Sequence, residues 1–159
     1  MKSVVAIFKY VFLSWILTVF LFSFSCKTDR NSSSSFNDYL SNYHSEIPVS
    51  PHYYVIISRF ACQTCFDDLL PIFLEKIKNE HSSRFSFIIA NQRTYMDLDC
   101  SSYEIIMDES GLIERLNMDI TDFAIIRTKN GKIVNSWNFN LSTMNGFNIF
   151  LNKEFELLY

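Results

Sequence analysis

The sequence predicts an α/β domain whose mixed central sheet of about four strands has helices on both faces. Two observations lead to this fold class. Strand-like and helix-like patterns alternate in the first half of the chain, which is typical of a parallel βαβ unit. Further along, an Asn-Gly pair separates two β-branched runs, which indicates an antiparallel hairpin.

The first part of the predicted domain contains a helix, a strand and a second helix. Apolar residues recur at helical spacing over residues 36–47, and Pro48 ends this first helix. Residues 53–58 are β-branched and aromatic, as expected of a buried strand. A second apolar helical face runs from Phe66 to about Glu80, and we expect Pro71 to kink this helix.

The second part adds more strands and a last helix. Residues 85–91 predict a strand, residues 103–108 a shorter extended piece, and residues 109–118 a short helical segment. The run "FAIIRTKNGKIVNSW" predicts two strands joined at Asn130–Gly131. A C-terminal helix is predicted by apolar residues at helical spacing, namely Phe147, Phe150, Leu151, Phe155 and Leu158.

Residues 1–25 have the pattern of a signal peptide. Lys2 and Lys9 lie near the start, and residues 10–25 carry no charge. This uncharged stretch is shorter than the roughly 20 residues of a bilayer span, and it suits a signal-peptide core. The polar, serine-rich residues 26–35 predict a flexible tether, which leaves residues 36–159 as the folded domain.

The boundary at Cys26 resembles a bacterial lipoprotein signal, in which the cysteine becomes the lipid-bearing first residue of the mature chain. Small residues precede Cys26, and the tether begins directly after it. This resemblance implies a protein that is exported and held at the cell envelope by a lipid on Cys26, with its domain periplasmic or surface-exposed. Lys27 favours the outer membrane. The alternative is an uncleaved signal anchor in which Cys26 has no role.

Charge and cysteine content narrow the function. Removal of residues 1–25 takes away two lysines and no acidic residue, which changes the net charge from −3 to −5. No basic stripe remains, so nucleic acid is not expected as a partner. Apart from Cys26, three cysteines remain in the exported part, Cys62, Cys65 and Cys100, and the odd number leaves one thiol over if the other two pair.

The cysteine pair and its surroundings resemble the thioredoxin-like superfamily. The matching parts are "YYVIISRFACQTC", the helix after it, and "YEIIMDESGLIERLNMDITDFAIIRTKNGKIV". The last stretch is similar to membrane-anchored thiol-disulfide oxidoreductases of the cytochrome-maturation type, in which a D-x-x-G segment also precedes a helix and a hairpin with a "dGkiv" turn. The resemblance covers about residues 50–158. It implies thiol–disulfide exchange with protein cysteines, an electron donor or acceptor still to be identified, and no cofactor.

Within this resemblance, the positions of the two cysteines assign their roles. Cys62 falls at a helix start, where free N–H groups and the helix dipole favour a thiolate, so we expect it to be the attacking thiol. Cys65, one turn further in, would be the resolving thiol. Positive potential from Arg59 would support a Cys62 thiolate, whereas Asp67 and Asp68, expected in the first turn, would oppose it.

The chain departs from the family at two positions. The cis-proline that faces the CxxC in thioredoxin-like enzymes falls here on Asp122 or Phe123, and a trans bond is expected. We expect this loop, with Gln63 and Thr64, to meet the substrate. Ile56 stands where thioredoxin buries a carboxylate. Both departures keep a second function open, a redox-inactive thioredoxin-like lipoprotein that binds a partner protein or peptide.

Other uses of the cysteines find less support. A structural disulfide would close only a short loop and gain little stability, although it remains an alternative. A zinc site needs four ligands, and apart from the pair only Cys100 and scattered histidines at positions 44, 52 and 81 are available, so no metal is expected. Haem attachment needs a histidine where Phe66 stands.

Overall fold

The structure is a computed structural model that describes residues 28–61, 63–78, 82–90, 102–116, 118–120 and 122–155. The chain divides into two compact units, Met1–Asn31 and Ser32–Tyr159, and the second unit holds the sheet. In the described part of the chain, no helix is long and apolar enough to cross a membrane.

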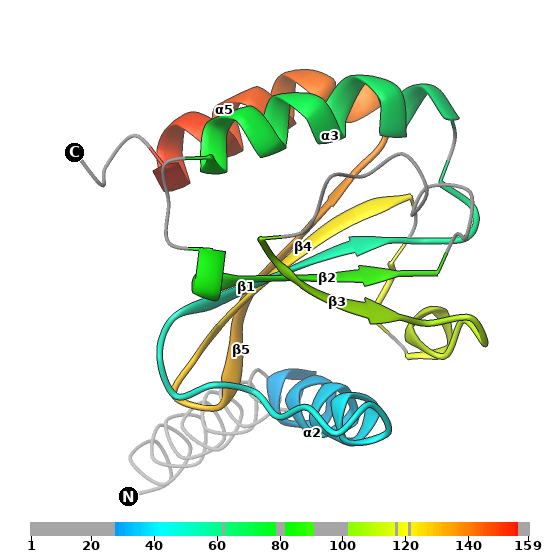
Figure 1. Cartoon of the computed structure of the whole chain (residues 1–159), viewed down its shortest axis with the longest axis vertical. Helices are drawn as coiled ribbons and strands as arrows, with labels where there is room; N and C mark the ends of the chain where they lie inside the picture. Colours follow the sequence, from blue (N-terminus) through cyan, green and yellow to red (C-terminus); the bar gives the residue numbers. More distant parts are fainter. Residues whose placement is uncertain are drawn as a thin grey trace, which may run out of the picture. The chain divides into compact units, whose positions relative to one another are not determined.

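A five-stranded mixed sheet forms the centre of the domain, with the order β3-β2-β1-β4-β5 (Figure 1). The parallel strands are β1 (His52–Ile57), β2 (Phe85–Ile89) and β3 (Glu104–Met107). Strand β4 (Phe123–Lys129) is antiparallel to both β1 and β5 (Lys132–Phe139). The predicted mixed sheet is therefore confirmed, with five strands rather than about four because residues 104–107 pair with β2.

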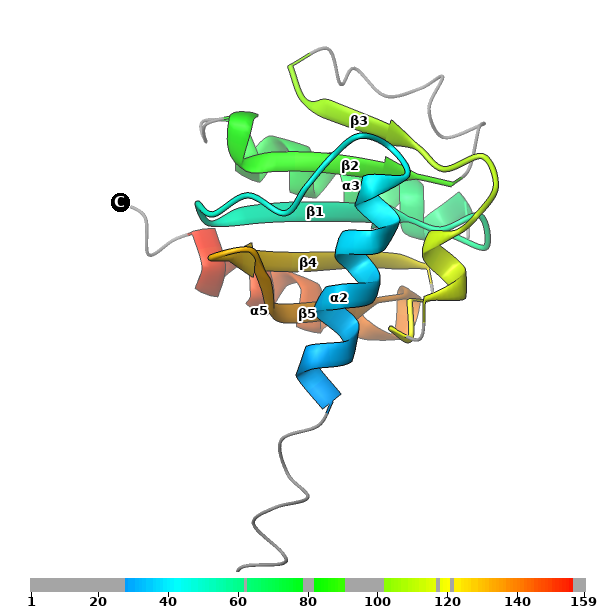
Figure 2. The same ribbon diagram turned by 90° about the horizontal axis from the view of Figure 1, so that it is seen from below.

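Helices cover both faces of the sheet, as the sequence predicts. Helices α3 (Gln63–Ile77) and α5 (Met144–Phe155) lie side by side on one face, whereas α2 (Thr28–Ser41) crosses the other (Figures 1 and 2). The alternation of β1 divides the core between these faces. Tyr53, Val55 and Ile57 pack with α3 and α5, and Tyr54 and Ile56 pack with α2.

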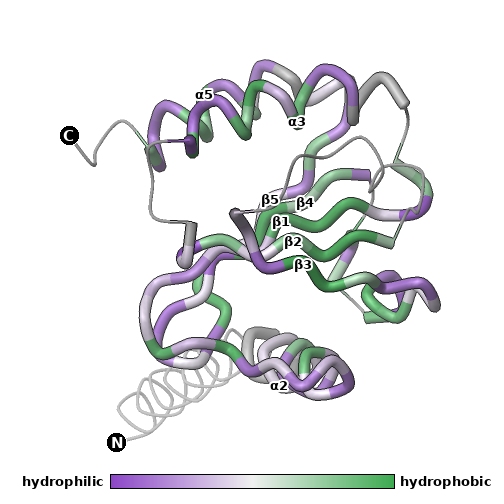
Figure 3. The backbone as a smooth tube through the Cα atoms, viewed as in Figure 1, coloured by the Kyte–Doolittle hydropathy of each residue, from purple (hydrophilic) through white to green (hydrophobic). Residues whose placement is uncertain are grey.

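Strand β1 is the central element of the packing. All six of its residues are buried, as expected of a strand with neighbours on both edges and helices on both faces. Figure 3 shows the same pattern, because the hydrophobic colour is concentrated along the central strands, while the helices mix both colours. Phe73 of α3 is the main aromatic contact of the α3–α5 face, with ring centroids 6.1–6.5 Å from five other phenylalanines.

Helix α2 begins earlier than the sequence suggests. It starts at Thr28, so Thr28–Ser35 form the first part of a helix, and the expected flexible tether is wrong for these residues. The helix is joined to the sheet there, since the Ile133 N–H donates to the Ser33 hydroxyl oxygen at 3.2 Å. Serine has no apolar side chain, so the hydrophobic pattern first becomes visible at Phe36.

The hairpin between β4 and β5 is confirmed at the predicted residues. Asn130 and Gly131 have φ values of 54° and 69°, the left-handed conformations that a tight two-residue hairpin turn requires. The segment 109–118 is less helical than expected, with only a 3-10 turn at Ile113–Arg115. Pro71 lies inside α3, which continues without a break to Ile77.

Candidate functional site

The CxxC follows the carboxyl end of β1 and leads into α3. Hydrogen bonds fix the connection, because the Ser58 N–H donates to the Asp122 carbonyl at 3.0 Å and the Ala61 N–H donates to the Ser58 carbonyl at 3.1 Å. The Phe60 N–H also donates to the Ser58 hydroxyl oxygen at 3.0 Å. This turn leaves the Phe60 side chain 73% exposed, directly before the motif.

The structure covers the predicted cysteines only in part. The first turn of α3 is formed by Gln63, Thr64 and Cys65. The structure describes the backbone of these residues but not their side chains. Cys62, Cys26 and Cys100 also lie outside the described residues. The assignment of Cys62 as attacking thiol and Cys65 as resolving thiol therefore stays a prediction.

The predicted loop at Asp122 and Phe123 lies next to the CxxC connection. Asp122 is half-buried and accepts the Ser58 N–H through its carbonyl, which joins the two segments. The Asp122–Phe123 peptide bond is trans, as expected. The Phe123 side chain points into the core, 1% exposed and packed against Phe147 with ring centroids 5.7 Å apart. Phe123 is therefore not accessible to a partner chain.

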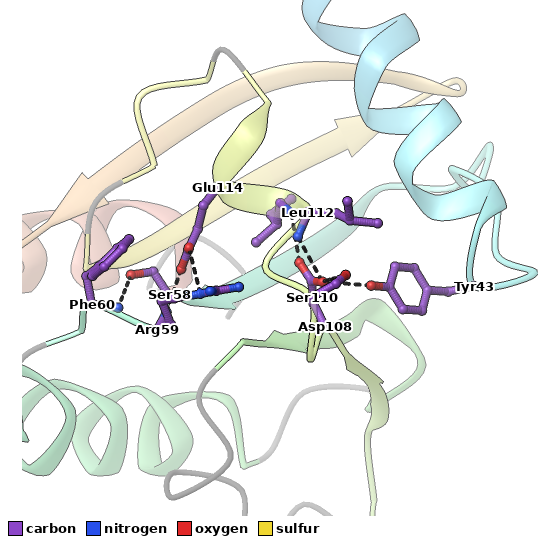
Figure 4. A network of polar contacts seen from close by, with 9 residues as sticks. Tyr43, Ser58, Arg59, Phe60, Asp108, Ser110, Leu112 and Glu114 are labelled. Carbon is purple, nitrogen blue, oxygen red and sulfur yellow. Dashed lines mark hydrogen bonds and ion pairs between the residues drawn. The ribbon is translucent and has the colours of Figure 1, made fainter.

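An acidic residue that the sequence analysis did not identify holds Arg59. The Glu114 carboxylate accepts the Arg59 N–H at 2.6 Å through Oε1 and lies 3.1 Å from the Arg59 Nε through Oε2 (Figure 4). Gly111 makes room for the guanidinium, since a Cβ at Gly111 would lie 1.7 Å from an Arg59 nitrogen. We call Arg59, Gly111 and Glu114 the Arg59 clasp.

A second carboxylate, Asp108, holds the segment that carries the clasp. Its Oδ1 accepts hydrogen bonds from the Tyr43 hydroxyl at 2.7 Å, the Ser110 hydroxyl at 3.1 Å and the Leu112 N–H at 3.0 Å. Its Oδ2 accepts the Ile113 N–H at 2.7 Å (Figure 4). Burial by itself raises the pKa of Asp108, but these hydrogen bonds outweigh it and hold the pKa below its usual value.

Two acidic residues lie further from the helix start than the sequence suggests. Because α3 begins at Gln63, Asp67 and Asp68 fall in its second turn, and the first turn carries no acidic residue. The expectation that they stand in the first turn is wrong. The helix dipole acts mainly within the first turn. Asp67 and Asp68, which lie beyond that turn, therefore counteract the stabilisation of a thiolate at the helix start less than expected.

Another polar cluster lies at the opposite end of the parallel strands. The His52 Nε2 lies 2.8 Å from the Ser86 hydroxyl, which donates to the Glu104 carboxylate at 2.5 Å. Since the hydroxyl proton goes to Glu104, the Nε2–H donates to Ser86. His52 is 5% exposed and begins β1, so this histidine is buried in the sheet.

This cluster does not have the geometry of a hydrolase triad. Ser86 is fully buried and lies between the histidine and the carboxylate, whereas a catalytic histidine stands between the nucleophile and the acid. Burial lowers the pKa of His52, and the Glu104 carboxylate acts in the opposite direction. Among the described residues, no group of three or more His, Cys, Asp or Glu side chains is placed to hold a metal ion.

The fold and the site together define an α/β domain with a CxxC that follows the carboxyl end of its central strand and continues into the first turn of a helix. No protein-family model, no curated protein and no solved structure matches the chain.

Proposed function

We propose that this protein catalyses thiol–disulfide exchange with protein substrates at the cell envelope. The Cys62 thiolate attacks a substrate disulfide, forms a mixed disulfide and releases one substrate thiolate. The Cys65 thiolate then attacks the Cys62 sulfur and releases the second. The substrate is reduced by two electrons, and the CxxC becomes a disulfide. The reverse sequence oxidises a substrate, and neither direction needs a cofactor.

The observation that carries this proposal is the position of the motif. A CxxC that leaves a central strand and opens a helix has its first cysteine beside unpaired helix N–H groups, which stabilise a thiolate. The connection before it is fixed by hydrogen bonds to Asp122 and Glu114, so the residues that lead to the motif are held by the fold.

The finer fold assignment belongs to the same proposal. A β1–α3–β2 unit, a β4–β5 hairpin and a C-terminal helix on the face of α3 are compatible with a thioredoxin-like fold. We also propose that residues 1–25 are removed and that Cys26 carries the lipid. Labelling with a fatty-acid analogue should mark the wild type and not a Cys26→Ser variant. Equal labelling of both would exclude lipidation at Cys26.

One observation favours the second candidate, a redox-inactive module that binds a partner protein or peptide. Phe60 is 73% exposed directly before the motif, which leaves its ring accessible to a partner chain. In this case the Phe60 surface and the loop at Asp122 form a docking site, and the cysteines form an inert disulfide.

The reduction potential of the Cys62–Cys65 pair separates these functions. It should be measured in the full chain with Cys26 and Cys100 replaced by serine, in equilibrium with glutathione buffers. A potential between about −120 and −270 mV supports exchange catalysis. A potential below about −300 mV marks a structural disulfide and supports the binding module. A Cys65→Ser variant should then retain a mixed disulfide with its substrate only in the first case.

A further inference from the structure

The charge of Arg59, three residues before Cys62 in the chain, is paired with the Glu114 carboxylate. Glu114 binds both the backbone N–H and the side chain of Arg59, and its own side chain is 12% exposed compared with 41% for Arg59. An exposed ion pair contributes little because its partners move freely. Here Glu114 is held by the backbone N–H of Arg59 as well as by its side chain, and the guanidinium lies against Gly111.

The carboxylate of Glu114 is itself positioned by the rest of the segment. The Asp108 side chain binds the N–H groups of Leu112 and Ile113, directly before Glu114, and Asp108 is fully buried. The Arg115 N–H donates to the Leu112 carbonyl at 3.0 Å, which closes the turn that presents Glu114. The Arg59 clasp is thus built into the fold.

Arg59 of the clasp lies close to the CxxC in the chain. Three peptide units separate Arg59 from Cys62, which limits the distance between their Cα atoms to about 11 Å. The Debye length in physiological salt is about 8 Å, so charges separated by a distance of this order are only partly screened. Other acidic groups on neighbouring segments, namely Glu109, Asp122, Asp67 and Asp68, are unchanged when the clasp is altered.

We propose that Glu114 is a positioning residue that sets the reactivity of Cys62 by neutralising Arg59. This inference rests on the proposed exchange function. With both members present, the clasp contributes no net charge, and the Cys62 thiolate depends on the helix start and on the other neighbouring charges. Removal of either member exposes the charge of the other, so the two removals act on the thiolate in opposite directions.

Because the two variants have opposite effects on the local charge, they distinguish an effect of charge on Cys62 from a purely structural role. Glu114→Gln leaves the Arg59 cation uncompensated, while the amide oxygen can still accept the Arg59 N–H. Arg59→Met leaves the Glu114 carboxylate uncompensated and keeps the backbone hydrogen bond. Both variants break the ion pair and affect stability in the same direction, but they change the local charge with opposite sign.

The measurement is the rate of iodoacetamide alkylation against pH in the full chain, with Cys26, Cys65 and Cys100 replaced by serine. Relative to this triple-serine background, we expect the pH midpoint of the alkylation rate to move to lower pH in Glu114→Gln and to higher pH in Arg59→Met, each by about half a pH unit. The double variant should return close to the background. Matched controls are Glu109→Gln and Arg115→Met, which make the same charge changes at exposed neighbouring positions and should shift the midpoint less.

Midpoints that stay fixed, that move in the same direction, or that move as much in the controls would overturn the proposal. The outcome does not depend on the reduction potential of the cysteine pair. If that potential marks a structural disulfide while the midpoints still move in opposite directions, the exchange function fails and the charge effect of the clasp stands. If the potential supports exchange and the midpoints do not move, only the role of Glu114 fails.

Discussion

The Tyr43 hydroxyl lies 2.7 Å from the Oδ1 of Asp108, which joins the turn after α2 to the carboxyl end of β3. The two residues are 65 positions apart in the chain. Through this contact the segment that carries the Arg59 clasp is attached to the α2 face of the sheet. The CxxC connection therefore depends on packing that lies on the other side of the sheet from α3.

Removal of this hydroxyl should destabilise the domain measurably. A hydrogen bond to a charged group contributes about 1.5–3 kcal/mol, so Tyr43→Phe should lower the free energy of unfolding by about that amount in urea titrations. Tyr54→Phe is the matched control, because the Tyr54 hydroxyl donates to an uncharged group, the backbone carbonyl of Glu46, at a longer distance of 3.4 Å. An equal loss in both variants would show that the Asp108 carboxylate adds nothing.

Stability should decrease in mild acid because of His52. Burial lowers the pKa of His52, so the unfolded chain takes up the proton first. The contribution of the neutral ring is complete above the unfolded pKa of about 6.5 and is lost as the pH falls below it. His52→Gln can still donate an N–H to Ser86 but does not titrate.

The measurement is the free energy of unfolding of the wild type and the variant between pH 7.5 and pH 5. The wild type should lose stability relative to His52→Gln over this range, with a difference of about 1 kcal/mol at the lower end. His44→Asn serves as the control, since His44 is exposed, and it should keep the acid sensitivity of the wild type. Parallel curves for wild type and His52→Gln would contradict the role of His52.

Alanine substitutions at the three glycines test how firmly the Arg59 clasp is held, because only Gly111 lies against Arg59. Gly111→Ala places a methyl group 1.7 Å from an Arg59 nitrogen and adds the strain of a φ of +64°. Gly131→Ala carries similar strain, with a φ of +69°, but its Cβ meets no atom within 4 Å. Gly146→Ala, inside α5, has neither problem and should stabilise the domain by up to about 1 kcal/mol.

We expect Gly131→Ala to cost about 1–2 kcal/mol in unfolding experiments and Gly111→Ala to cost more. The difference between the two losses of unfolding free energy measures the cost of displacing the Arg59 side chain. Gly111→Ala should also shift the alkylation midpoint of Cys62, whereas Gly131→Ala should not. A Gly111→Ala variant as stable as Gly131→Ala would mean that Arg59 is easily displaced.

A Phe60→Ala variant distinguishes a loss of substrate contact from a loss of stability. Because its side chain is 73% exposed, Phe60→Ala should change the free energy of unfolding by no more than about 0.5 kcal/mol. Phe73→Ala, which removes a fully buried ring, should cost about 3–5 kcal/mol. If Phe60 meets the partner chain, Phe60→Ala should slow the reduction of a protein disulfide and leave the reaction with a small disulfide unchanged. Equal rates with both substrates would exclude Phe60 from the docking surface.

The sheet and the faces of its helices could be predicted from the sequence because apolar periodicity encodes them directly. The alternation of Tyr53 and Tyr54 between two cores follows from the strand geometry, and Asn130–Gly131 marks the turn by itself. Both are local properties of the chain. They need no knowledge of which segments become neighbours.

The contacts around the site could not be predicted for the opposite reason. Glu114 and Arg59 are 55 positions apart, and only the folded chain brings them together. The spacing of Asp108 and Gly111 was visible as a D-x-x-G segment, but its function as the support of a carboxylate was not. His52 is linked to Glu104 through Ser86 by the pairing of three strands, and this register is not encoded in any one of them.

The bond between Ser33 and the N–H of Ile133 has a consequence for self-association. Strand β5 is an edge of the sheet, and free N–H groups on an edge can pair with a strand of another molecule. The Ser33 hydroxyl occupies one of these donors close to the hairpin turn. The serine-rich segment therefore leaves one fewer N–H group on this edge free to pair with the sheet of a neighbouring copy.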